Sequence, residues 1–159
     1  MVNIWKIGSW PGLWDNNTIK NKERYIKEYA LPKNFVAIGS GYIPNIKKLS
    51  EDELIRILDR KNKLKKKQQI LDFANVIDKE DVILLYNHYK VYVGIVKNPY
   101  YHVKMGSEKD FIKDTDNGNI APHRIDVYWQ FYGAPFNADF SKWQDTVHQV
   151  FEEDLSSVN

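Results

Sequence analysis

The chain has 159 residues, a hydrophobic content of 43% and a formal net charge of +2, values typical of one globular domain. It contains no cysteine, which excludes disulfides and thiolate metal sites. No apolar run approaches the roughly 20 residues that a bilayer span needs, and the first residues lack a signal-peptide pattern. We therefore expect a cytoplasmic protein without a membrane segment.

The first third of the chain predicts a strand, a helix and a second strand. Residues 3–8 are typical of a short apolar strand, which Pro11-Gly12 would end. Residues 20–30 have helical periodicity, and Leu31-Pro32 is expected to stop that helix. A strand is then predicted over residues 34–39.

Two helices follow, with a basic run at their junction. Ser50 and Glu53 have the spacing of a capping box, so a helix is expected to begin there. The apolar positions that define the second helix are Ile70, Phe73, Ala74 and Ile77.

The second half predicts mostly strands. Residues 81–86 and 90–96 are expected to pair as a hairpin, and 123–131 form another strand. The polar connection 104–122 is long enough to be either functional or disordered. A last helix is predicted with Ser141 as its cap and an apolar face formed by Trp143, Val147, Val150 and Phe151. This order of elements indicates the α+β class, with a curved or barrel-like mixed sheet flanked by helices.

Motifs of catalysis and metal binding are missing from the sequence. It contains no phosphate-binding loop of the Walker type, no H-E-x-x-H and no G-x-S-x-G. The four histidines are isolated and lack ligand-like spacing. We therefore predict no catalytic residue, no metal site and no cofactor.

Aromatic residues beside glycine-containing turns are the strongest functional signal. Trp10 and Trp14 flank the turn after the first strand, and Tyr42 follows Gly39-Ser40-Gly41. Tyr100 and Tyr101 come at the end of the hairpin. Nucleobases stack on such rings for roughly 1–3 kcal/mol each, so these residues predict a pocket for a base.

The basic run allows two interpretations. It consists of Lys61, Lys63, Lys65, Lys66 and Lys67, preceded by Arg56 and Arg60. Clustered lysines can contact the phosphates of a nucleic acid even when the whole chain is nearly neutral. Lysine-rich stretches are equally often the solvated surface of a helix.

Taken in order, five segments resemble a known family. They are Gly8-Ser9-Trp10, residues 35–41, 77–83 and 92–101, and His123-Arg124-Ile125-Asp126-Val127-Tyr128-Trp129. The set resembles the EVE branch of the PUA-like superfamily, which is related to YTH and ASCH domains. It is most similar to the versions at the N-terminus of McrB-type modification-dependent restriction proteins. The resemblance covers residues 3–155 as one domain and leaves 156–159 as a tail.

The resemblance implies a barrel-like sheet with a pocket for a flipped, often methylated base. Ser9 and Trp10 match the family's pocket turn, and Tyr100 with Tyr101 match its aromatic pair. Ser40 stands where relatives often have a cage tryptophan. His123 and Arg124 match the start of a strand near which backbone phosphates could lie.

Together these observations predict a recognition domain that is not an enzyme. We expect it to bind DNA, with a modified base flipped into the pocket, as the specificity module of a modification-dependent restriction system. Its partners would be DNA, an AAA+ GTPase motor region of the same protein and a nuclease subunit. Two alternatives stay open at this point: a PUA-like RNA-binding domain, and a protein-interaction module of a restriction complex.

Overall fold

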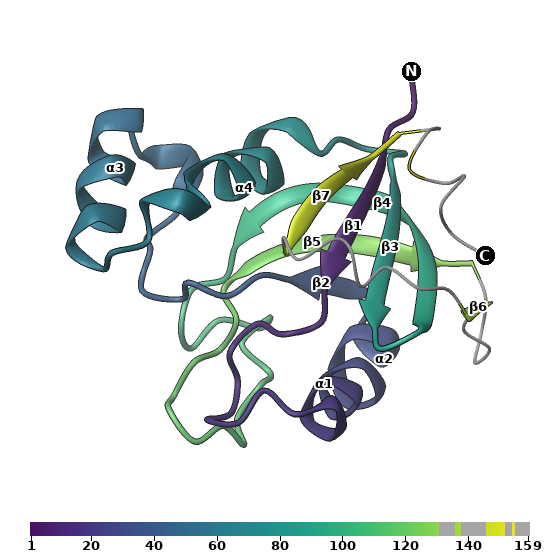
Figure 1. The fold of residues 1–159 in the computed structure, drawn as a ribbon. Coiled ribbons are helices and arrows are strands. Elements are labelled where there is room, and N and C mark those ends of the chain that lie inside the picture. Colours follow the sequence, from purple (N-terminus) through teal and green to yellow (C-terminus); the bar gives the residue numbers. More distant parts are fainter. Residues whose placement is uncertain (131–135, 138–145, 152–153, 155–159) are drawn as a thin grey trace.

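The computed structural model describes residues 1–130, 136–137, 146–151 and 154, and its strands form one mixed sheet (Figure 1). The order is β2-β5-β4-β3-β1-β7, and β6 pairs with β4. The strands are β1 (Ile4–Gly8), β2 (Phe35–Ala37), β3 (Val82–Asn87), β4 (Lys90–His102), β5 (His123–Trp129), β6 (Phe136–Asn137) and β7 (Val147–Val150). Among these described strands β1 and β3 run parallel, and the remaining pairs are antiparallel. The α+β class predicted from the sequence is confirmed.

The sheet is curved but open, which corrects the expectation of a barrel (Figure 1). Closure would require the two edge strands to pair with each other. β2 and β7 form the edges, and no ladder joins them within the described part of the chain. β2 pairs with β5 over three residues and β7 with β1 over four, so both edges are short.

The first helix is longer than its sequence pattern predicts. It consists of α1 (Ile19–Tyr25), a π-helical stretch (Ile26–Ala30) and α2 (Leu31–Lys33). The predicted stop before Leu31-Pro32 was wrong. Pro32 lies where the π-helical stretch gives way to α2, so its missing N–H falls at a change of hydrogen-bonding pattern. Asn34, with a φ of 56°, ends the helix instead.

Two hydrogen bonds fasten this helix to the sheet. Tyr25 is fully buried, and its hydroxyl accepts the backbone N–H of Ala37 in β2 at 3.0 Å. The indole N–H of Trp129, at the end of β5, donates to the carbonyl of Ala30 at 2.9 Å. In Figure 1 the helix lies below the strands.

The two predicted helices after residue 50 are confirmed. Ser50 and Glu53 form the capping box of α3 (Glu51–Arg60), with both reciprocal hydrogen bonds present. A 3-10 turn (Leu64–Lys66), α4 (Lys67–Leu71) and a π-helical stretch (Asp72–Val76) then form the second helical segment. A short 3-10 turn (Ile46–Lys48) precedes both. The basic run lies at their junction, as expected.

The hairpin of β3 and β4 is confirmed as well. Its turn residues, His88 and Tyr89, have φ angles of 42° and 63°, the left-handed geometry that fits the twist of a two-residue hairpin. Beyond Val96 the pairing of β4 with β5 shifts register twice before His102. These irregularities bend β4, whose curvature is plain in Figure 1.

The C-terminal helix predicted after Ser141 is corrected over its described part. Val147–Val150 form β7 and pair with β1, so Val150 lies opposite Ile4. Valines three apart lie on one face of a helix but on opposite faces of a strand, so their spacing favours a helix. The long-range pairing with β1 overrides this local preference. Ser141, Trp143 and the tail 156–159 lie outside the described residues. None of the helices described is both long and apolar enough to cross a bilayer.

Candidate functional site

A cleft of about 340 Å³ opens where β1 ends, and we call it the Trp10 cleft. It brings together the turn after β1, the turn after β2 and the basic run, which are far apart in the sequence. Five residues singled out from the sequence meet here. They are Trp10, Ser40, Tyr42, Lys63 and Lys66. The remaining lining residues are Gly12, Ile38, Gly39, Gln69, Ile70, Thr146 and Val147.

Trp10 is supported from behind by Trp14, which does not itself line the cleft. The two ring centroids are 6.4 Å apart, with the planes tilted by 43°. Trp14 is 4% exposed, and its indole N–H donates to the backbone carbonyl of Asp114 at 3.0 Å. The guanidinium of Arg24 lies 4.2 Å from the Trp14 ring centroid. Trp14 therefore fixes the turn, and Trp10 is the ring that a ligand can reach.

Ser40 lies in a strained turn between β2 and the 3-10 turn. Its φ of 64° is in the left-handed region, which costs a residue with a Cβ free energy and tends to occur at functional sites. The Ser40 carbonyl accepts two hydrogen bonds, from the backbone N–H of Ile43 at 3.0 Å and from His123 Nε2 at 3.2 Å. No described residue hydrogen-bonds to Ser40 Oγ, so this hydroxyl can serve a ligand.

His123 and Tyr100 hold that turn from inside the protein. His123 has no exposed surface, and its Nδ1 accepts the Tyr100 hydroxyl proton at 2.8 Å. The Tyr100 hydroxyl in turn accepts the backbone N–H of Ile46 at 3.1 Å. Burial, with a smaller contribution from nearby His102, lowers the pKa of His123 to about 4. A neutral, buried ring cannot contact phosphates, so the expected role of His123 is corrected, and Tyr100 is not a pocket wall.

Arg124, the other residue expected near phosphates, is also fully buried. Its guanidinium donates to three backbone carbonyls, those of Ala121 at 2.8 Å, Lys109 at 2.7 Å and Ile120 at 2.7 Å. Burial lowers the pKa of Arg124, and these carbonyls compensate a charge that water does not reach. Arg124 therefore holds the connection 104–122 in place, and it offers nothing to a phosphate.

Two other predicted pocket residues do not line the Trp10 cleft. The Tyr101 hydroxyl donates to Asp126 Oδ1 at 2.6 Å, and Lys109 Nζ is 4.5 Å from the Tyr101 ring centroid. Ser9 is buried and lines another hollow of about 320 Å³, which Lys6 and Trp10 also line. This hollow shares Trp10 and Thr146 with the Trp10 cleft, but Ser9 and Tyr101 do not line the Trp10 cleft itself.

The basic run divides into lysines at the cleft and lysines beyond it. Lys63 and Lys66 line the Trp10 cleft, and Lys61 Nζ lies 5.1 Å from the Tyr42 ring centroid. Lys65 is exposed next to them. Lys67 instead pairs with Glu51 of α3 at 2.9 Å.

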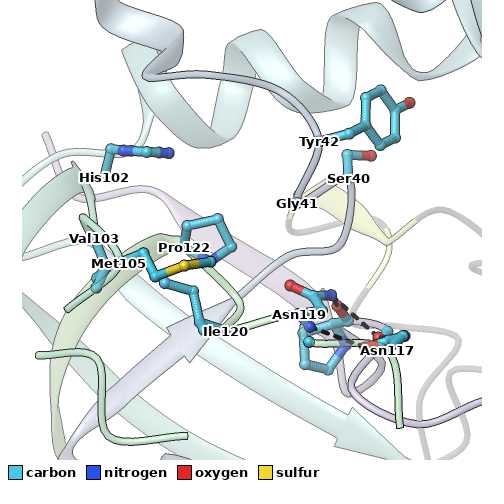
Figure 2. Close-up of a pocket in the computed structure, with 13 residues that line it drawn as sticks. Ser40, Gly41, Tyr42, His102, Val103, Met105, Asn117, Asn119, Ile120 and Pro122 are labelled. Carbon is cyan, nitrogen blue, oxygen red and sulfur yellow. Dashed lines mark hydrogen bonds between the residues drawn. The ribbon is translucent and has the colours of Figure 1, made fainter. Parts of the chain in front are cut away.

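A second and larger cleft, of about 610 Å³, adjoins the first, and we call it the Asn119 cleft (Figure 2). The two clefts share Gly12, Ser40 and Tyr42. The other residues that line the second cleft are Pro11, Gly41, His102, Val103, Met105, Asn117, Gly118, Asn119, Ile120 and Pro122.

Asn119 connects the turn after β1 to the connection 104–122. Its amide nitrogen donates to the carbonyls of Pro11 at 3.0 Å and Gly12 at 3.1 Å, and its Oδ1 accepts the N–H of Ala121 at 2.8 Å. Gly41 approaches it so closely that an added Cβ would lie 2.7 Å from Asn119 Oδ1. The connection and the segment after β1 also lie side by side in Figure 1.

Several lining residues were missed by sequence reasoning. Thr146 and Val147 reach the Trp10 cleft because β7 pairs with β1, and the sequence indicated a helix there. His102 and Asn119 line the second cleft, although histidines were dismissed as isolated. Of these residues only Asn119 had a signal in the sequence, namely the length of the polar connection 104–122, which marked it as functional or disordered.

No protein-family model, curated protein or solved structure matches this chain. Within the described residues, no three histidine, aspartate or glutamate side chains gather as metal ligands. The resemblance to EVE domains therefore stays a prediction, which none of these comparisons supports.

Proposed function

We propose that the chain is a non-catalytic domain that binds DNA and takes one flipped, modified base into the Trp10 cleft. One observation carries the proposal: the cleft combines an aromatic wall, two lysines and a hydroxyl that has no hydrogen-bond partner among the described residues. The wall is formed by Trp10 and Tyr42, the hydroxyl is Ser40 Oγ, and the lysines are Lys63 and Lys66.

The size and composition of the cleft suit a flat, partly polar ring. Its volume of about 340 Å³ is near the lower end of the range for small-molecule sites, roughly 300–1,000 Å³. Trp10 offers a stacking face, and Ser40 Oγ can donate to or accept from the edge of a base. Glycines at 12 and 39 let the backbone approach the ligand closely.

The charges around the cleft favour a polyanion. No aspartate or glutamate is among the described residues that line it. Lys63 and Lys66 stand at the cleft, with Lys61 and Lys65 next to them. A base that leaves a duplex brings its backbone phosphates to the mouth of the pocket, where these lysines can contact them.

The resemblance to McrB-type domains supports DNA as the nucleic acid and a modified base as the ligand. In that setting the domain acts in the cytoplasm as the specificity module of a restriction system. The GTPase motor and the nuclease that translocate and cut DNA lie outside these 159 residues.

The test is a titration of fluorescent duplexes at fixed low salt, followed by anisotropy. Otherwise identical duplexes carry cytosine, 5-methylcytosine, 5-hydroxymethylcytosine or N6-methyladenine, and an RNA of the same sequence is included. We expect one modified DNA to bind at least tenfold more tightly than the unmodified duplex. Equal binding of all DNAs would refute a modified-base pocket, and tighter binding of the RNA would refute DNA as the target.

Tyr42 provides a variant with a closely matched control. Tyr42 is 44% exposed with Lys61 Nζ 5.1 Å from its ring, and Tyr128 is 54% exposed with Lys97 Nζ at the same distance. Tyr42→Ala should weaken modified-DNA binding by about fivefold or more, the loss of one stacking face. Tyr128→Ala, away from both clefts, should leave binding unchanged. Equal effects of the two variants would contradict the assignment.

A further inference from the structure

The Asn119 cleft is continuous with the Trp10 cleft. Gly12, Ser40 and Tyr42 line both, so a ligand that fills one lies directly against the wall of the other. Its volume, about 610 Å³, is nearly twice that of the Trp10 cleft and lies well within the range of ligand sites. One flipped base in the Trp10 cleft would leave this larger space beside it.

The polar side chains of the Asn119 cleft differ in whether they already hydrogen-bond within the described part of the protein. Asn117 and Asn119 direct their amide nitrogens to the carbonyls of Pro11 and Gly12, so they build the wall. The ring nitrogens of His102 have no hydrogen-bond partner within the described residues. Figure 2 shows the His102 ring directed toward the space between Pro122 and the Ser40–Tyr42 turn.

His102 has the chemistry of a surface on which a base can stack. Burial and the charge of Lys48 lower its pKa, so the ring is neutral near pH 7 and keeps one donor and one acceptor nitrogen. Nucleobases stack on histidine as they do on other aromatic side chains. Val103, Met105 and Pro122 supply apolar surface next to it. No carboxylate is among the described residues that line this cleft.

We propose that the Asn119 cleft binds the nucleotide next to the flipped base, with His102 and Met105 contacting the base of that neighbour. This inference rests on the proposed function, because it needs a base in the Trp10 cleft. It makes the domain selective for one flanking position as well as for the modification. The Ser40–Tyr42 turn separates the two bases and contacts both.

The experiment uses duplexes that carry the modification preferred in the titration above. In two further duplexes, the residue on the 5′ side or on the 3′ side of the modified base is abasic. The wild-type protein should bind one of the two abasic duplexes about fivefold or more weakly than the intact duplex. The other abasic duplex should bind normally, because only one neighbour can enter the cleft.

His102→Ala and Met105→Ala should abolish this difference and still discriminate modified from unmodified DNA. Met105 is 72% exposed, so its truncation leaves the fold intact, and Val76→Ala, 46% exposed and away from both clefts, is the control. Trp10→Ala should abolish discrimination of the modification.

The two proposals fail in different ways. If neither abasic duplex is impaired, or if both variants keep the difference, the Asn119 cleft is not a nucleotide site although the Trp10 cleft still is. If no modified duplex is preferred and Trp10→Ala changes nothing, the proposed function fails and this inference fails with it.

Discussion

His123 makes the stability of the protein depend on pH in a window where carboxyl groups contribute little. The ring is fully buried between the Tyr100 hydroxyl and the Ser40 carbonyl, and burial, followed by nearby His102, lowers its pKa to about 4. An unfolded chain has a histidine pKa near 6.5. Between these two values the unfolded state binds the proton and the folded state does not, so stability falls as the pH falls.

The size of the effect follows from the two pKa values. At pH 5 an unfolded histidine is almost fully protonated, whereas roughly a tenth of the folded molecules carry the proton on His123. The linkage relation converts this into a loss of about 2 kcal/mol between pH 7.5 and pH 5. At pH 4 the loss reaches about 3 kcal/mol, and it changes little below that.

The assay is urea unfolding at pH 7.5, 6 and 5, with His123→Gln beside the wild type. A glutamine amide can still donate to the Ser40 carbonyl but does not titrate. The variant should be less stable at pH 7.5 and should lose about 2 kcal/mol less than the wild type on going to pH 5. His102→Gln is the control for the part of the pH dependence that His102 contributes, because its pKa is also lowered by its burial and by Lys48.

Carboxyl groups contribute little to the change in stability between pH 7.5 and pH 5. Five carboxyl groups have pKa values held below their usual range by hydrogen bonds and nearby cations that outweigh burial. They are Glu23, Glu53, Asp110, Asp114 and Asp126. Their stabilisation is lost only as the pH falls through and below about 4, where the unfolded groups titrate. Equal losses of stability by wild type and His123→Gln between pH 7.5 and pH 5 would mean that His123 does not cause the pH dependence.

Two further outcomes are expected. Replacing Lys63 and Lys66 together by glutamine should weaken DNA binding whatever the sequence and reduce the slope of log K against log salt by about 1.5–2. Replacing Lys20 and Lys79 by glutamine is the control and should leave the affinity and the slope unchanged. An unchanged slope for the first variant would mean that the basic run is only solvated surface. Ser50→Ala should lower the free energy of unfolding, measured by urea titration, by about 1 kcal/mol, because α3 loses half of its capping box. DNA binding should be unchanged. A stability equal to that of the wild type would contradict this account of the cap.

Local signals in the sequence predicted the elements that local contacts determine. The capping box of Ser50 and Glu53 and the His88-Tyr89 turn involve residues close in sequence, and both are present. The prediction failed at Val147, because its three-residue spacing to Val150 favours a helix. Pairing with β1, about 140 residues earlier, decides for the strand, and no local pattern encodes that partner.

At the candidate site, too, local signals predicted some residues, and tertiary packing determined the rest. Trp10, Ser40 and Tyr42 could be named from the sequence because they adjoin glycine-containing turns, and the structure brings them to one cleft. Trp14 and Tyr100 adjoin a turn or a strand end as well, yet they are buried at 4% and 5% exposure. Which aromatic ring becomes wall and which becomes support depends on what packs behind the turn, and that is a tertiary property.

Arg124 shows how a residue can serve a site that it does not touch. A guanidinium presents five N–H donors in a rigid planar fork, and here it meets the carbonyls of Lys109, Ile120 and Ala121. Ile120 lines the Asn119 cleft, so the buried cation fixes the backbone from which that cleft is built. Lysine, with one nitrogen on a flexible stem, cannot reproduce three carbonyl contacts in this geometry. The charge that the sequence suggested for phosphates is used inside the protein, where it shapes the cleft proposed to hold the neighbouring nucleotide.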